Sequence, residues 1–178
     1  AQPGQMASAQ FRRSSPRRVG PRVLRLSQIA TGGNSVPRRG GQPSVRNTEA
    51  ATQAVIRAVY VQVLGTAGYA GERNTVEEIK LENGDITLRE FVRQVARSNA
   101  FRRRYWSGLY ICKAIEVMHR RILGRPTFGR WEINAYFDVA ARQGFYGVVD
   151  ALINSRDYLD SFGEDTVPYE RFVTPADR

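Results

Sequence analysis

Few residues in this chain could perform nucleophilic, acid–base or metal chemistry. It contains one histidine, His119, and one cysteine, Cys112. Both are expected on one helical stripe with Ile115 and Ile122, where seven residues of helix separate them by about 10 Å along the axis. Zinc–ligand bonds are about 2.0–2.3 Å long, so these side chains cannot be neighbouring ligands of one ion. We therefore predict a packed histidine and no metal site.

The segment GRPTFGR, residues 124–130, has two glycines at the spacing of a phosphate-binding loop. Arg130 and Trp131 stand where that motif requires Lys and Ser or Thr, and the segment follows a helix rather than a strand. We interpret it as an exposed basic-aromatic loop. No nucleophile motif accompanies His119, so the sequence predicts that the chain is not an enzyme.

Arginine occurs beside aromatic residues at three places, namely residues 101–106, the surroundings of loop 124–130, and the tail 162–172. Interface centres are enriched in Arg, Tyr and Trp, which favours partner binding. Alternatively the aromatic residues belong to the core and the arginines are merely solvated, an alternative favoured for Phe101 and Tyr105. The predicted partner-binding residues are Arg102, Arg103, Arg104, Tyr105, Trp106, Arg120, Arg121, Arg125, Phe128, Arg130, Trp131, Phe145, Tyr146, Tyr169, Arg171 and Phe172.

The first 48 residues carry nine arginines and no acidic residue, whereas the rest of the chain has 18 basic and 17 acidic residues. Rich in Pro, Gly and Ser, this segment should form an extended arm that is disordered when free, apart from a short apolar stretch at residues 19–29. Arginine forks bind carboxylates or phosphates. The arm is therefore a solvated tether, a segment that orders on an acidic partner, or a nucleic-acid contact. Its predicted contacts are Arg12, Arg13, Arg17, Arg18, Arg22, Arg25, Arg38 and Arg39.

The rest of the sequence contains two copies of one helical pattern. AVYVQVLG at residues 58–65 is echoed by VMHRRILG at 117–124, and VARSNAFRRRY at 95–105 by LINSRDYLDSF at 152–162. Three positions align in the second pair, namely Ser98 with Ser155, Phe101 with Tyr158, and Tyr105 with Phe162. We predict an all-α domain of two pseudo-repeated three-helix units, with six main helices.

Apolar residues at i, i+3 and i+4 spacing mark these helices. The expected core stripes are Val55, Ile56, Val59, Tyr60, Val63 and Leu64; Leu88, Phe91, Val92 and Val95; Ile111, Ile115, Met118 and Ile122; Ile133, Phe137 and Ala140; and Val148, Val149, Leu152 and Ile153. Asn74 with Glu77, and Thr87 with Glu90, have the spacing of capping boxes that begin the second and third helices. Gly144 should separate the last two helices. Strand signals are missing.

Composition sets further bounds. About 130 residues beyond the arm suit one domain with one core. No apolar run approaches the roughly 18 residues that span a bilayer, so no transmembrane segment is expected. A single cysteine excludes an internal disulfide framework and fits a reducing compartment. The Arg-rich start at Ala1 is either a transit peptide or an interdomain linker of a longer polypeptide, and we favour the second.

The segments after the arm resemble a known family, the linker polypeptides of phycobilisomes, the light-harvesting antennae of cyanobacteria and red algae. The resemblance rests on VYVQVLG, GDITLREFVRQVARSNAFRRRYW, HRRILGRP and the closing EINAYFDVAARQGFYGVVDALINSRDYLDSFGEDTVPYERF. Residues 105–134 look most like a repeat of the core-membrane linker. The resemblance implies an extended arm at 1–48, a linker domain at 49–175 and a tail at 176–178.

The resemblance further implies a non-enzymatic plug in the central cavity of allophycocyanin trimers or hexamers, which joins discs of the phycobilisome core and tunes bilins for directional energy transfer. The implied partners are the α and β subunits of allophycocyanin and other phycobilisome linkers. Cys112 does not match a bilin-attachment site, so no covalent cofactor is expected, and phycocyanobilin on partner subunits would lie nearby. The implied location is the cytoplasmic or stromal face of the thylakoid membrane, reached through the larger assembly.

Two alternatives to this function remain. A rod or rod-core linker of the same antenna would bind phycocyanin instead of allophycocyanin. A nucleic-acid-binding protein with a basic tail would fit the isoelectric point of about 10.4. The near-neutral folded part and an arm without lysine argue against nucleic acid as a partner.

Overall fold

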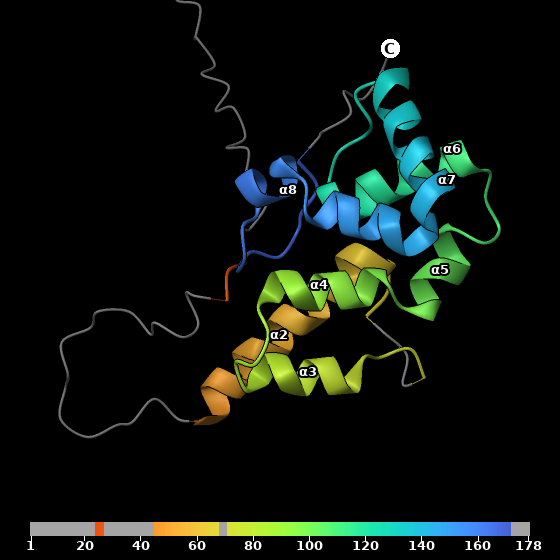
Figure 1. The fold of residues 1–178 in the computed structure, drawn as a ribbon. Helices are drawn as coiled ribbons and strands as arrows, with labels where there is room; N and C mark the ends of the chain where they lie inside the picture. Colours follow the sequence, from red (N-terminus) through yellow and green to blue (C-terminus); the bar gives the residue numbers. More distant parts are fainter. Residues whose placement is uncertain (1–23, 27–44, 68–70, 172–178) are drawn as a thin grey trace, which may run out of the picture.

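The computed structural model describes residues 24–26, 45–67 and 71–171 (Figure 1). Apart from one isolated β-bridge, every secondary-structure element in these ranges is helical, which confirms the predicted all-α class. The elements are α2 (Val45–Leu64), α3 (Thr75–Glu82), α4 (Leu88–Ala96), α5 (Asn99–Tyr105), α6 (Ile111–Met118), the π-helix η1 (His119–Leu123), α7 (Arg130–Ile153) and α8 (Arg156–Ser161). None of the helices in these ranges is long and apolar enough to cross a membrane.

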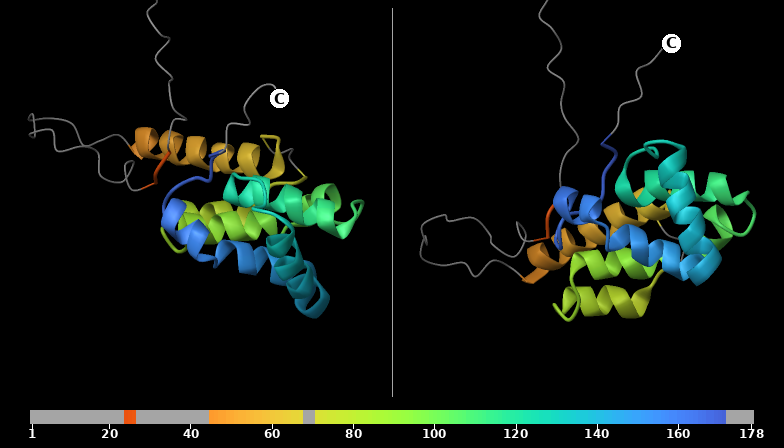
Figure 2. Two further views of the ribbon diagram at one scale, coloured as in Figure 1. Left: turned by 90° about the horizontal axis from the view of Figure 1, so that it is seen from above. Right: turned by 45° about the horizontal axis from the view of Figure 1, so that its top comes forward.

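The helices form two similar units. α2, α3 and α4 make the first unit, while α6 with η1 and the two halves of α7 make the second, so the six predicted main helices are present. Gly144 divides α7, as predicted, because its φ of 69° and ψ of −162° are not helical. A short helix that we did not predict ends each unit, α5 in the first and α8 in the second. Figure 2 shows the first half of α7 projecting from the bundle.

The aligned serines begin these short helices in the same way. Ser98 Oγ accepts a hydrogen bond from the amide of Phe101 at 3.3 Å, and Ser155 Oγ accepts one from the amide of Tyr158 at 3.2 Å. Each hydroxyl also donates to a carbonyl three residues earlier, at 2.6 Å in both units. In α5 the ring of Tyr105 packs edge-to-face on that of Phe101, with centroids 5.0 Å apart. In α8 the ring of Phe162 packs in the same way on that of Tyr158, with centroids 5.3 Å apart. The weak sequence repeat is therefore a true structural repeat.

The two predicted capping boxes differ in outcome. Thr87 accepts a hydrogen bond from the amide of Glu90 at 3.1 Å, as expected of an N-cap. The prediction is wrong for Asn74, whose side chain makes no capping bond although it occupies the N-cap position of α3. Its backbone amide instead donates to the buried hydroxyl of Tyr60 at 2.8 Å, which ties the start of α3 to α2.

One core joins both units, because α4 packs on α2 and on α7 while α2 also packs on η1 (Figure 2). The predicted stripe of α2 is buried throughout. The stripe predicted for the first half of α7 is wrong: Phe137 is exposed, and Ile133 and Ala140 are only partly buried. This half turns the buried Glu132 and the partly buried Tyr136 inward instead.

Residues 24–26 pair in antiparallel fashion with residues 165–167. Two backbone hydrogen bonds of 2.8 and 3.0 Å join the segments, donated by the amides of Leu26 and Val167. The predicted extended arm is not confirmed, because these three residues, including Arg25, lie against the domain. The other predicted arm contacts lie outside the described residues: Arg12, Arg13, Arg17, Arg18, Arg22, Arg38 and Arg39.

Candidate partner-binding surfaces

A cluster of guanidinium groups and aromatic rings lies where α5 meets the second half of α7; we call it the α5 surface and define it as Arg97, Arg102, Trp106, Phe145 and Tyr146. The guanidinium of Arg102 lies 5.6 Å from the ring centroid of Phe145 and 5.9 Å from that of Tyr146. That of Arg97 lies over Tyr146 at 4.5 Å, and the Trp106 and Phe145 rings are 5.5 Å apart. Arg102 and Tyr146 are exposed. Arg97 was not predicted, because only the contact with α7 brings it here.

The other members of the sequence FRRRY have different surroundings. Arg104 is partly buried and donates to the carbonyl of Leu64, to Thr66 Oγ1 and to a carboxylate oxygen of Glu72. Tyr105 also donates its hydroxyl to that carbonyl, at 2.8 Å. Arg103 is largely exposed and lies 3.8 Å from Glu72. Arg104 and Tyr105 thus hold the end of α2, while Arg102 and Arg103 face solvent.

Arg125 is buried, so the interpretation of loop 124–130 as exposed throughout is wrong. Its side chain is buried, with two donors on the Glu132 carboxylate at 2.8 and 3.0 Å and Nε on Asp157 at 2.7 Å. Burial raises the pKa of Glu132, but the hydrogen bonds from Arg125 and from the Phe128 amide outweigh it and lower that pKa below its ordinary value. A buried guanidinium needs such partners, since an unpaired buried charge is costly.

Within the same loop only Phe128 and Arg130 are exposed as predicted, because Gly124 is also buried and the other residues are partly buried. The Phe128 ring lies over the Arg125 guanidinium at 3.7 Å and stacks on Trp131, with centroids 6.5 Å apart. Both rings are more than half exposed, at 60% and 65%. Arg130, which lies between these two residues in the sequence, is also exposed. The result is an exposed aromatic pair that rests on a fixed guanidinium.

The two units share a buried carboxylate arrangement that the sequence did not reveal. In the first unit, Glu78 accepts hydrogen bonds from Arg73 and from the hydroxyl of Tyr60, the latter at 3.3 Å. In the second, Glu132 takes the place of Glu78, Arg125 that of Arg73, and His119 that of Tyr60. The Nε2 atom of His119 lies 3.5 Å from Glu132. Both glutamates are buried, near the start of the second helix of their unit.

His119 is fully buried, which confirms the prediction of a packed histidine. Its Nδ1 lies 2.7 Å from the carbonyl oxygen of Ile115, and Tyr136 packs edge-on at 4.6 Å. Burial lowers the pKa of the imidazole below its ordinary value. Cys112 is exposed in the first turn of α6, so it neither lies mid-helix nor shares the buried stripe of His119. Within the described ranges no three His, Cys, Asp or Glu side chains converge as a metal site would require.

The tail is folded onto the second unit. Arg171 donates to the carbonyl of Leu123 at 2.9 Å and to Asp157 at 3.1 and 3.2 Å. Tyr169 packs edge-to-face on the buried Phe162, with centroids 5.2 Å apart. Phe172 lies outside the described residues.

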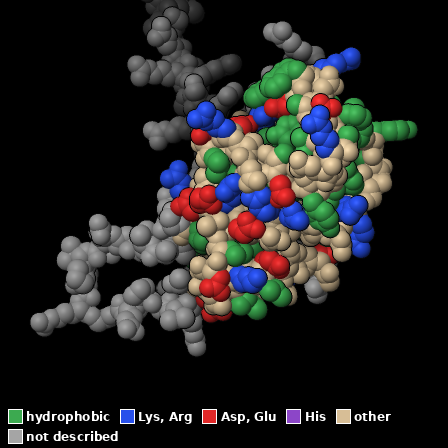
Figure 3. Space-filling model, in the orientation of Figure 1, with side chains coloured by type: hydrophobic (Ala, Val, Ile, Leu, Met, Phe, Trp, Pro, Cys, Tyr) green, Lys and Arg blue, Asp and Glu red, His purple; other side chains and the backbone are tan. Residues whose placement is uncertain are grey.

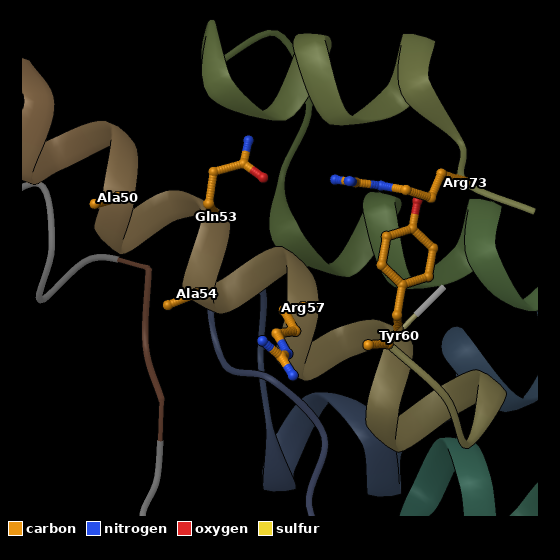
Figure 4. A pocket seen from close by; sticks show the side chains of 7 residues that line it. Ala50, Gln53, Ala54, Arg57, Tyr60 and Arg73 are labelled. Carbon is orange, nitrogen blue, oxygen red and sulfur yellow. The ribbon is translucent and has the colours of Figure 1, made fainter. Parts of the chain in front are cut away.

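Charges are mixed on the surface of the described residues (Figure 3), which also carries open clefts. Basic and acidic side chains are interspersed on the face seen in Figure 3. A cleft of about 540 Å³ lies along α2, between small residues such as Ala54 and the side chains of Arg57, Tyr60 and Arg73 (Figure 4). Arg120 and Arg121 line a second cleft, next to η1.

The fold and these surfaces define a helical domain of two repeated units that displays arginine and aromatic side chains. Residues 47–171 match the family model described as Phycobilisome Linker polypeptide, and the chain belongs to this family. The resemblance predicted from the sequence is thereby confirmed.

Curated relatives resemble almost the whole chain. Phycobiliprotein ApcE of Synechococcus sp. is 56% identical over 172 residues, which cover 96% of this chain and 24% of the relative. The proteins of the same name from Microchaete diplosiphon and Porphyra purpurea are 54% and 44% identical, over 97% of this chain and 16% and 19% of their own lengths. These relatives are core-membrane linkers, as the sequence motifs indicated. The chain spans only 16% to 24% of the length of these three curated relatives.

Proposed function

We propose that this domain is a non-enzymatic linker that fills the central cavity of allophycocyanin trimers or hexamers and joins the discs of the phycobilisome core. Membership of the linker family supports a structural rather than a catalytic role. One observation carries the proposal: at the α5 surface, the exposed Arg102 has no carboxylate within 4.0 Å among the described residues and lies beside the exposed ring of Tyr146. This pair is available to the α and β subunits of allophycocyanin.

The α5 surface is suited to binding because it is already ordered. The buried Phe145 ring packs on Phe101 and Trp106, and Arg102 rests on the rings of Phe145 and Tyr146. Binding a partner therefore costs little additional side-chain entropy. Charge-assisted hydrogen bonds from the Arg102 guanidinium to acidic groups of the allophycocyanin subunits would supply specificity and would speed their encounter.

The Phe128–Trp131 pair supplies a second contact. These rings would pack beside phycocyanobilin carried by partner subunits, restrict its geometry and lower the local polarity, and so tune directional energy transfer. No bilin is attached to this chain in the proposal, and Cys112 is left without that role. The Arg-rich segment before the domain would reach other phycobilisome linkers or the next ring. The assembly would place the chain on the cytoplasmic or stromal face of the thylakoid membrane.

The proposal is tested by mixing the chain with purified allophycocyanin and, separately, phycocyanin, and measuring co-elution and absorption. Arg102→Ala should weaken binding to allophycocyanin. Arg142→Ala should not; Arg142 is another exposed arginine that has no carboxylate partner in the part of the chain that the structure describes. Arg104 is left in place because its contacts with α2 make it structural. Preferential binding to phycocyanin would favour a rod or rod-core linker instead. Binding to neither ring would overturn the proposal.

A further inference from the structure

Arg121 differs from the other arginines of the described chain. Each remaining partly or fully buried arginine lies within 4.0 Å of a carboxylate. Apart from Arg121, the described arginines without a carboxylate partner are all exposed, namely Arg25, Arg57, Arg102, Arg130, Arg142 and Arg156. Arg121 is partly buried and has no carboxylate partner among these residues. A partly desolvated cation without a counter-charge is unfavourable, which favours an external anion as its partner.

The fold holds this guanidinium in place. It lies 5.2 Å from the centroid of the Tyr105 ring, and its Nη1 is 3.5 Å from the carbonyl oxygen of Gln62. The Gln62 amide in turn donates to the carbonyl of Arg121 at 3.3 Å, within the π-helix η1. Gly65 leaves the necessary room, because a Cβ there would lie 3.2 and 3.3 Å from the two terminal nitrogens of Arg121.

The guanidinium lines a cleft of about 300 Å³ together with Gln62, Val117, Arg120 and Glu170. Arg120 contributes a second, half-exposed guanidinium whose only described carboxylate partner is Glu116, at 3.4 Å. The cleft thus has two cations, one carboxylate, an amide and a small apolar wall, so basic side chains outnumber acidic ones. A planar carboxylate matches the fork of an arginine and can accept two of its hydrogen bonds.

We propose that this cleft binds a carboxylate group of a protein partner, with Arg121 as the primary ligand and Arg120 as the second. The inference rests on the proposed function, because it takes the partner to be a ring subunit of the antenna. The carboxylate comes either from an Asp or Glu side chain or from a chain terminus. Glu170 also lines the cleft, yet it lies farther than 4.0 Å from every described arginine, so it leaves the site free.

The first test measures binding of the whole chain to purified allophycocyanin at moderate salt. Arg121→Gln should bind about tenfold more weakly, and Arg121→Lys should recover only part of the loss because it keeps the charge without the fork. Arg156→Gln removes the same charge from an exposed position and should bind as the unaltered chain does. Thermal unfolding of each variant checks that the loss is not one of folding. Equal binding by Arg121→Gln and Arg156→Gln would refute the carboxylate site while leaving the proposed function intact.

The second test does not depend on allophycocyanin. NMR signals of the ¹⁵N-labelled Arg121 side chain are followed during titration with two peptides, hexaglutamate with an amidated C-terminus and hexaserine with a free one. A shift of the Arg121 signals that saturates with one peptide, while the side-chain signals of the exposed Arg156 stay in place, supports the site and identifies its source of carboxylate. No shift with either peptide overturns the inference. Glu170→Gln should bind at least as tightly as the unaltered chain, and weaker binding would show that Glu170 itself is needed.

Discussion

Arg171 donates a hydrogen bond from Nε to the carbonyl oxygen of Leu123, at 2.9 Å, where the first helix of the second unit ends. In the first unit the hydroxyl of Tyr105 donates to the equivalent carbonyl, that of Leu64, at 2.8 Å. The residue aligned with Tyr105 is Phe162, which has no hydroxyl. The tail therefore supplies through a guanidinium what the first unit supplies through a phenol, because carbonyls at a helix end need partners from outside the helix.

Tyr105→Phe removes one of the donors at the end of α2. Arg104 also donates to the Leu64 carbonyl, at 3.2 Å, so the loss should be at the low end for a hydrogen bond, about 0.5–1 kcal/mol. Urea unfolding measures it. Tyr110→Phe, at a side chain that is 90% exposed, is the matched control and should change nothing. Equal stability of both variants would contradict the assigned role of the hydroxyl.

Tyr158→Phe should have the opposite effect and should make the folded domain more stable. The Tyr158 hydroxyl is buried without a hydrogen-bond partner among the described residues, and the aligned residue of the first unit is Phe101. Removing a buried unsatisfied polar group should raise the free energy of unfolding by about 1 kcal/mol.

The contrasting variant is Tyr60→Phe. The Tyr60 hydroxyl has two partners, and burial raises its pKa to about 12. Its removal should lower the free energy of unfolding by about 1–2 kcal/mol. A loss of stability in Tyr158→Phe as well would show that its hydroxyl is satisfied by a buried water.

Arg125→Leu should be strongly destabilising, by about 3–5 kcal/mol, because it leaves the carboxylate of Glu132 buried without its guanidinium. Replacing both residues by leucine should recover much of this loss, since a buried ion pair is often no better than an apolar pair. Chemical unfolding of the two variants and of the exposed control Arg142→Leu decides the matter. A loss below about 1 kcal/mol in the single variant would speak against a buried pair.

The stability of the domain should fall in mild acid because of His119. The folded protein holds this imidazole neutral, with its pKa lowered by burial, whereas the unfolded chain binds a proton near pH 6.5. The unfolded state then binds more protons, so stability is complete above about pH 6.5 and declines as the pH falls, by at most about 1.4 kcal/mol per unit. Melting temperatures between pH 7.5 and 5.5 should therefore drop in the unaltered chain.

His119→Gln is the matched variant and should lose this slope. Below about pH 5 both proteins should lose further stability, because arginine partners lower the pKa values of Glu132 and Asp157 against the opposing effect of burial. Identical pH profiles for the two proteins above pH 5 would contradict the assignment to His119.

Helical periodicity was sufficient to predict most of the fold. The stripes of α2 and α4, the break at Gly144 and the repeat around Ser98 and Ser155 are all local patterns, and local patterns are visible in a sequence. The prediction for the first half of α7 was wrong because Ile133 and Phe137 have helical spacing, yet Phe137 is exposed and Ile133 is only partly buried.

The candidate site was less predictable because it depends on tertiary contacts. Nothing in the sequence FRRRY distinguishes Arg102, which faces solvent, from Arg104, which holds α2. Likewise Arg125 looked like an exposed loop residue until Glu132 and Asp157 were seen to surround it. Arginine clusters mark a region, but which carboxylate reaches which guanidinium is decided by the packing of distant helices.

The bridge between residues 24–26 and 165–167 shortens the distance that the chain can span. Some 139 residues separate Leu26 from Asp165 along the chain, a contour of roughly 460 Å if fully extended, yet their backbone atoms are 2.8 Å apart. The residues between them would therefore add nothing to the distance between a segment before residue 24 and a segment after residue 167. In a longer polypeptide, the spacing between neighbouring modules would depend on the segments outside the bridge, and breaking two hydrogen bonds would be the first step in lengthening it.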